Sequence, residues 1–226
     1  MASKKNSKPA VVILVTNQKG GSGKSTTSLN LSRAFHEEGK RVLLCDADPQ
    51  NTLLSWYAQA DEESRIPIPY FNLAQPGIDI STELEKLQFE FDYIVIDGRP
   101  DVEIDMSALL LLSDLVLVPL QASMADLHST EVVVRDIRIA QEDKRPDLKF
   151  SLVLTMVSNN RLLLNYTKDA IKERGYPLCK TMVARRECQA HAYALGQTVF
   201  DSKTASYRAA ADEARKLAAE VAQLVS

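Results

Sequence analysis

The chain has 226 residues, of which 45% are hydrophobic and 25% charged, and its formal net charge is −3. This composition is typical of a folded globular protein and excludes collagen-like, low-complexity and largely disordered classes. No apolar run reaches the roughly 18 residues that a membrane span requires, and no secretory segment follows the first lysines, so we expect a cytoplasmic protein. Cys45, Cys179 and Cys188 are far apart, which predicts buried or inert thiols rather than disulfides or a zinc site.

The charges are distributed unevenly along the chain. Residues 1–9 carry three lysines and no acid, residues 10–143 carry 10 basic and 22 acidic residues, and residues 144–226 carry 14 basic and 8 acidic residues. We therefore expect a flexible basic arm over residues 1–9, followed by a single domain over residues 10–226 whose last third is basic.

Strand-like and helix-like segments alternate along the domain. Residues 10–16 form a short, β-branched apolar run, and they are followed by a glycine-rich loop and by apolar positions at helical spacing up to Gly39. Further strands are predicted at residues 41–45, 93–96, 115–118 and 150–154, and helices at residues 130–142 and 162–174. This alternation predicts an α/β fold, a doubly wound and mostly parallel sheet with helices on both faces.

Polar residues follow three of the predicted strands. Asn17, Asp46 and Asp97 each come at or directly after a strand end. Ligands bind beyond the carboxyl ends of the strands in a doubly wound sheet, so these three side chains are predicted to converge at a binding site.

The last segment, residues 204–225, is rich in alanine and has Leu217, Val221 and Leu224 at helical intervals among acids and bases. A helix that lies on a membrane surface has bulkier apolar residues and a mainly basic polar face. We therefore expect a helix that packs on the core.

A glycine-rich loop lies between the first predicted strand and the first predicted helix, and from residue 19 it reads K-G-G-S-G-K-S-T. Glycines let backbone N–H groups approach nucleotide phosphates, and a helix N-terminus adds positive potential. Lys24 is placed to reach the β- and γ-phosphates, and Ser25 to bind Mg²⁺. The expected nucleotide-binding residues are Gly20, Gly21, Ser22, Gly23, Lys24, Ser25 and Thr26. The alternative is a glycine-rich turn that binds no ligand.

The loop departs from the general phosphate-loop pattern at Gln18, where that pattern has glycine, and a second lysine, Lys19, follows. With this loop the chain resembles the ParA/MinD superfamily, which has a deviant Walker A motif. The sequence D-A-D-P-Q, which begins at Asp46, is similar to the first switch of the ParA partition branch. The resemblance spans nearly the whole chain and implies a P-loop ATPase domain over residues 10–226, with ATP and Mg²⁺ as cofactors.

The resemblance also implies roles for individual residues. Lys19 would cross an ATP-sandwiched homodimer and touch the partner's nucleotide, as an arginine finger does in other NTPases. Asp48 would position or activate the attacking water, and Asp46 would lie nearer the metal. A solvated loop lysine is the alternative for Lys19, and a turn with an Asx cap is the alternative for the aspartates.

Residues 91–97 form an apolar strand that ends in Asp97, the Walker B arrangement in which the carboxylate holds Mg²⁺ through its water shell. The family more often continues D-x-P-P, whereas this chain reads D-G-R-P. The role of Arg99 therefore stays open.

The basic last third suggests DNA binding, because clustered cations neutralise phosphates. The candidate residues are Lys180, Arg185, Arg186, Lys203 and Arg208. No base-reading motif accompanies them, and ParA-type proteins bind DNA without sequence preference as ATP dimers. Solvated helix faces are the alternative. Because the first strand is predicted to begin near Ala10, we expect neither the N-terminal helix-turn-helix domain of longer partition ATPases nor operator-specific repression.

The resemblance thus implies a small ATPase that partitions or positions DNA or another cargo while associated with the nucleoid. A ParB-like or cargo-adaptor partner would stimulate its hydrolysis. A MinD-like regulator that cycles on a membrane is the first alternative, and the terminal helix argues against it. The nitrogenase iron protein shares the loop but requires cluster-bridging cysteines, whereas Cys45 lies in an apolar strand. Kinase or synthetase activity stays open, and the sequence does not name the cargo.

Overall fold

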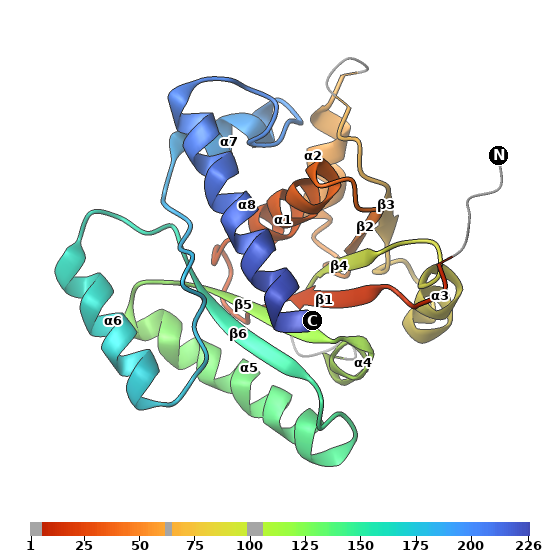
Figure 1. The fold of residues 1–226 in the computed structure, drawn as a ribbon, viewed down its shortest axis with the longest axis horizontal. Helices are drawn as coiled ribbons and strands as arrows, with labels where there is room; N and C mark the ends of the chain where they lie inside the picture. The colour runs from red at the N-terminus through yellow and green to blue at the C-terminus, as the bar shows by residue number, and fades with distance from the viewer. Residues whose placement is uncertain (1–5, 62–64, 99–105) are drawn as a thin grey trace.

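The computed structural model describes residues 6–61, 65–98 and 106–226. Within these ranges six strands form one sheet in the order β3-β2-β4-β1-β5-β6, with helices on both faces (Figure 1). The strands are β1 (Val11–Val15), β2 (Val42–Asp46), β3 (Tyr70–Asn72), β4 (Tyr93–Asp97), β5 (Leu115–Gln121) and β6 (Lys149–Thr155). Every strand pair in this sheet is parallel, which confirms the predicted fold class.

Five of the described helices connect successive strands, and three more follow β6. They are α1 (Lys24–Glu37), α2 (Thr52–Gln59), α3 (Ile80–Leu87), α4 (Met106–Leu112), α5 (Met124–Asp143), α6 (Arg161–Glu173), α7 (Glu187–Ala194) and α8 (Ala205–Val225). The prediction of a helix from residue 130 is wrong at its start. Helix α5 begins six residues earlier because Ser123 caps it, accepting a hydrogen bond of 3.1 Å from the backbone N–H of Asp126.

Several short elements were not anticipated from the sequence. Strand β3 has three half-buried residues and lies at an edge of the described sheet, so it lacks both the length and the apolar run of the other strands. Helices α2, α3, α4 and α7 have eight residues or fewer, which is about two turns, too few for a clear helical period.

Side chains alternate between the two faces of the sheet and so build two apolar layers. On β1, Val12 and Leu14 pack in a layer with α3, α4, α5 and α6. The neighbouring Ile13 and Val15 pack in a second layer, with α1, α2 and α8. A strand that is covered on both faces must be apolar at every position, which explains the continuous run in the sequence.

Strand β1 lies at the centre of the sheet, between β4 and β5. The chain runs from β1 toward β2 on one side and later crosses to β5 on the other, so the end of β1 is the switch point of the topology. Asp46 and Asp97 are register partners at the ends of β2 and β4. Asn17, just past β1, instead turns toward β5 and α5, where its side-chain amide donates hydrogen bonds to the Pro119 carbonyl at 2.7 Å and the Thr130 hydroxyl at 3.2 Å.

Residue 6, which belongs to the predicted basic arm over residues 1–9, contacts the domain. The Asn6 backbone N–H donates to the Phe89 carbonyl at 2.7 Å, and the Asn6 side chain donates to the Asp92 carboxylate at 3.0 Å. Asp92 also holds Arg41 in an ion pair of 2.9 Å. Residue 6 is therefore anchored beside β4, and Lys4 and Lys5 of the arm lie outside the described residues.

Helix α8 packs on α1, as Figure 1 shows, and buries Leu217 and Val221 there. The predicted packing helix is confirmed, one residue shorter than expected at its start because Thr204 is its N-cap. Among the residues that the structure describes, no helix is long and apolar enough to span a membrane.

We expect Gly196→Ala to destabilise the fold far more than Gly175→Ala. Both glycines have positive φ, +62° and +66°, so each substitution carries a similar backbone cost of about 1–2 kcal/mol. A Cβ on Gly196 would lie 2.1 Å from the backbone nitrogen of Ala60 after α2, whereas a Cβ on Gly175 would meet nothing within 4 Å. Urea unfolding of both variants measures the difference, and equal midpoints would contradict the close packing of α7 on α2.

Candidate nucleotide-binding site

The glycine-rich loop leaves the end of β1 and turns into α1 through two glycines with positive φ, Gly21 at 72° and Gly23 at 90°. Gly23 is the N-cap of α1 and has no side chain that would occupy the N–H groups of the first turn. The loop is fixed from outside, because the Thr155 hydroxyl donates to the Ser22 carbonyl at 2.7 Å. The result is a rigid helix N-terminus suited to an anion.

Lys24 is the first residue of α1 and is buried. Its ammonium group donates to the Lys19 carbonyl at 3.3 Å. Burial lowers the pKa of Lys24, and the nearby charges of Asp97 and Asp48 oppose that shift. A buried ammonium group between a helix N-terminus and two carboxylates is held in place for a polyanionic ligand.

Asp46 and Asp97 lie side by side beneath the start of α1. Burial and the Asp46 charge raise the pKa of Asp97 to about 7, although hydrogen bonds from Ser25 and Ser28 and the Lys24 charge act the other way. The Ser28 hydroxyl donates to Asp97 Oδ1 at 3.0 Å. Burial likewise raises the pKa of Asp46, and its Oδ1 accepts the Asp48 N–H at 2.9 Å.

The other oxygen of Asp97, Oδ2, is buried and has no hydrogen-bond partner among the described residues. A buried carboxylate oxygen without a partner is costly, and it is a ligand that Mg²⁺ prefers. Ser25 and Asp46 supply further oxygen atoms around it. The residues predicted to hold Mg²⁺, namely Ser25, Asp46 and Asp97, therefore fit a hard cation in both position and chemistry.

Asp48 follows β2 and is buried at the wall of a cavity that the glycine-rich loop also lines. Its Oδ1 accepts the Gln50 N–H at 2.9 Å, which is an Asx turn. The turn that the sequence analysis offered as an alternative is thus present, and the carboxylate still borders the cavity. Both uses of Asp48 are compatible.

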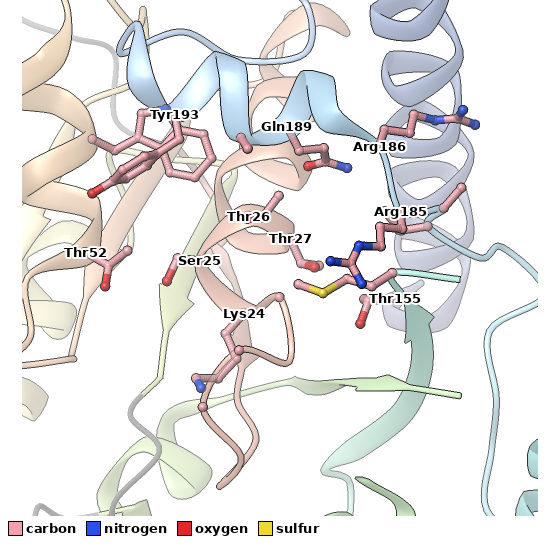
Figure 2. Close-up of a pocket in the computed structure, with 18 of the residues that line it drawn as sticks. Lys24, Ser25, Thr26, Thr27, Thr52, Thr155, Arg185, Arg186, Gln189 and Tyr193 are labelled. Atoms are coloured by element: carbon pink, nitrogen blue, oxygen red, sulfur yellow. The ribbon is translucent and has the colours of Figure 1, made fainter. Parts of the chain in front are cut away.

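A cavity of about 680 Å³ extends from the glycine-rich loop to α7. Figure 2 shows Lys24, Ser25 and Thr26 on one side and Gln189 and Tyr193 of α7 on the other. Tyr193 is fixed against Trp56 of α2, with ring centroids 5.1 Å apart in an edge-to-face arrangement. The cavity therefore extends beyond the glycine-rich loop, as far as the side chains of α7.

Segment 183–193 forms a wall of the cavity that no sequence motif marks and that was therefore not predicted. Gln189 is fixed by the Asn30 side-chain amide of α1, which donates to it at 3.2 Å. Arg185 and Arg186, which we had assigned to DNA, line this cavity. Figure 2 shows Arg186 directed toward α8, where its guanidinium group pairs with Glu213 at 2.5 Å. Arg185 is exposed at the cavity, whereas Arg186 is held by α8, and the assignment of both arginines to DNA stays a prediction.

The other DNA candidates are exposed at opposite ends of α8. Lys203 and Arg208 lie together at its start, where the Arg208 guanidinium group donates to the Lys203 carbonyl at 2.6 Å. Lys180 lies near its end, because the Lys180 N–H donates to Glu220 at 2.7 Å. Helix α8 rises about 1.5 Å per residue, so the two sets are separated along its length.

Lys19 does not point away from its own chain in this structure. Its ammonium group pairs with the Asp126 carboxylate of α5 at 2.5 Å.

Arg99 lies outside the described residues, so its role stays open. All three cysteines are buried, as predicted, and they lie on separate elements: Cys45 on β2, Cys179 beyond α6 and Cys188 on α7.

Comparison with known protein families matches residues 13–199 to the CobQ/CobB/MinD/ParA nucleotide binding domain. The chain belongs to this family. The resemblance inferred from the lysine-containing loop is thereby confirmed. The match covers the sheet, the glycine-rich loop and the cavity wall up to α7.

Individual relatives agree with the family. The chain is 31% identical to the maintenance of carboxysome distribution protein A of Halothiobacillus neapolitanus, over 98% of this chain and 99% of that protein. It is 28% identical to the sporulation initiation inhibitor protein Soj of Bacillus subtilis, over 92% of this chain and 98% of that protein. A Cyanothece McdA in complex with ATP has the same fold, with a TM-score of 0.75 at 16% identity over 95% of this chain and 97% of that one.

We expect Lys24→Ala to lose at least about 100-fold in affinity for ATP, because each lost charge-assisted contact to phosphate costs one or more factors of ten. Lys40→Ala is the matched control, since Lys40 is an exposed lysine beyond the other end of α1. Titration with a fluorescent ATP analogue measures both affinities, and thermal unfolding without nucleotide checks the fold. Unchanged affinity in Lys24→Ala would place the phosphates elsewhere.

Proposed function

We propose that the protein is an ATP-dependent dimerising ATPase that positions DNA or another cellular cargo. The observation that carries this proposal is the arrangement at the end of β1. One loop brings together Lys24, Ser25 and the additional Lys19, next to the carboxylates of Asp46, Asp48 and Asp97. The full-length similarity to a carboxysome distribution protein supports a positioning role.

In this proposal the triphosphate of ATP binds at the N-terminus of α1, with Lys24 on the β- and γ-phosphates. The ribose and base extend into the rest of the cavity, toward Arg185, Gln189 and Tyr193. Mg²⁺, held by Ser25, Asp97 and the nearby Asp46, supplies charge neutralisation on the phosphate oxygens. ATP complexes of similarly folded proteins support this choice of nucleotide.

Asp48 has the role of orienting the water that attacks the γ-phosphate. Its backbone N–H is fixed on Asp46, and its own Oδ1 is fixed by the Gln50 N–H. A carboxylate that is held at the cavity wall accepts a hydrogen bond from water without first having to reorganise. Lys19 of a second subunit would stabilise the negative charge that develops during transfer.

We expect Lys19→Gln to bind ATP with nearly unchanged affinity but to remain a monomer, because a neutral side chain does not neutralise the partner's phosphates. Sedimentation velocity with ATP measures the size. Asp48→Ala is the positive control and is expected to lose hydrolysis while retaining the ATP dimer. A Lys19→Gln protein that dimerises like the parent would rule out the cross-subunit role.

DNA binding by the ATP dimer is the second part of the proposal. The exposed cations Lys203 and Arg208 at the start of α8 supply positive charge, and a symmetric dimer presents them twice. Salt-dependent retention of any duplex follows from counterion release. The buried apolar face of α8 supports this proposal over a MinD-like membrane cycle, because a helix packed on α1 does not offer that face to lipid.

We expect Lys203→Glu combined with Arg208→Glu to weaken ATP-dependent retention of unrelated duplexes and to reduce the slope of log affinity against log salt by about 2 per subunit. Lys149→Glu is the control, because Lys149 is exposed at the start of β6, on the sheet edge opposite the glycine-rich loop. Filter binding over a salt series measures the slopes. Equal slopes for the two variants would exclude the start of α8.

The last part of the proposal is a partner that stimulates hydrolysis, either a ParB-like protein or a cargo adaptor. Slow intrinsic turnover and faster turnover with the partner would make ATP hydrolysis the timer for release from the nucleoid. Relatives in the same family act in carboxysome distribution and chromosome partitioning by their names, which supports a cargo-bound partner of this kind.

A further inference from the structure

The ion pair between Lys19 and Asp126 lies within one chain, across the gap between the glycine-rich loop and α5. The ammonium nitrogen is 2.5 Å from Asp126 Oδ1, and the two side chains are 40% and 1% exposed. The lysine therefore reaches in from the surface to a carboxylate that is almost completely covered. An ion pair with one buried member is screened by salt less than a pair on the surface.

Asp126 is held so that its carboxylate stays ionised and fixed. Its Oδ1 also accepts the Ser123 hydroxyl at 2.5 Å, and its Oδ2 accepts the Gln121 N–H at 3.2 Å. Burial by itself would raise the pKa of Asp126, but these hydrogen bonds and Lys19 lower it overall. The position in the first turn of α5 favours the negative charge as well.

The loop is tied to the same corner of the structure by neutral contacts. The Gln121 side-chain amide donates to the Gly21 carbonyl at 3.1 Å, and the Lys19 N–H donates to Asn17 Oδ1 at 3.2 Å. These contacts keep the backbone of residue 19 beside α5. Lys19 is therefore directed at its own subunit, whereas the proposed function requires it to reach the other subunit.

The cap of α5 does not need the Asp126 carboxylate. Ser123 caps the helix through the backbone N–H of Asp126, at 3.1 Å, and any residue other than proline at position 126 can keep that contact. The carboxylate is thus an addition to the cap, and its contact with Lys19 requires a separate explanation.

We propose that Asp126 is a positioning residue that holds Lys19 within the monomer, so that ATP-driven pairing must exchange this ion pair for a contact with the partner's phosphates. This inference rests on the proposed function. Asp126 then sets the threshold of ATP dimerisation, and ADP, which lacks the γ-phosphate, leaves Lys19 paired in its own chain.

The exchange has a calculable effect on assembly. The apparent dissociation constant equals the intrinsic constant divided by the fraction of protein in the binding-competent state. Because a dimer needs two competent subunits, that fraction enters as its square. If Lys19 is released in about one third of the monomers, the dissociation constant of the ATP dimer is raised about ninefold. Removal of the competing carboxylate is expected to restore that factor.

The test uses Asp126→Asn, which keeps the size of the side chain and an acceptor for the Gln121 N–H. With a non-hydrolysable ATP analogue, we expect its dimer dissociation constant in sedimentation equilibrium to be about ninefold lower than that of the parent chain. Its affinity for ADP as a monomer is expected to be unchanged. Glu131→Gln is the matched control, because it removes another α5 carboxylate, one that pairs with Arg174 at 2.7 Å and does not touch Lys19.

A purely structural role for Asp126 would give a different pattern. The double variant Lys19→Gln with Asp126→Asn is expected to stay monomeric, which shows that the gain acts through the lysine. Asp126→Ser, which also retains a hydrogen-bond acceptor, replaces Asp126→Asn if thermal unfolding shows that the latter does not fold. If the parent dimerises and the neutral variants have a dissociation constant equal to or higher than that of the parent, the inference is overturned. If the parent and Glu131→Gln both stay monomeric with the ATP analogue, the proposed function fails, and this inference fails with it.

Discussion

The charge balance beneath the start of α1 is the constraint on which the rest of the site depends. One ammonium group, on Lys24, lies among the carboxylates of Asp46, Asp48 and Asp97, all of them buried. Charges in a medium of low dielectric are costly unless they are paired or bind an ion. The raised pKa of Asp97, about 7, and its unpartnered Oδ2 both express that cost. A cation and a polyanion bound together would relieve that cost, so the binding of each would favour the binding of the other.

Helix α8 links the candidate site to the surface of the protein through two further carboxylates. Glu220 accepts the backbone N–H groups of Lys180 and Thr181, at 2.7 and 3.0 Å. Glu213 accepts the Ala184 N–H at 3.1 Å and pairs with Arg186. Two carboxylates on one helix thus hold the segment that forms the far wall of the cavity. The helix that carries the exposed cations is therefore part of the architecture of the binding site.

The sequence predicted those features that depend on short-range patterns. Short, mainly aliphatic runs predicted five buried strands, since a strand covered on both faces is apolar at nearly every position. Elements without such a pattern escaped prediction, including β3 and the two-turn helices. The wrong start of α5 has a similar cause, because Ser123 and Asp126 lie before the periodic apolar positions and their capping contacts were not recognised.

The sequence by itself determined the family, the sheet and the residues that belong to the phosphate loop, because glycine spacing and adjacent lysines are local requirements of a loop between a strand and a helix. Only the tertiary structure decided what lies opposite that loop. Arg185 lies at the cavity wall and Lys19 pairs with Asp126, because segments distant in the sequence meet at the carboxyl end of the sheet. Such contacts depend on how helices pack on the two faces of the sheet, and no local pattern of residues encodes that packing.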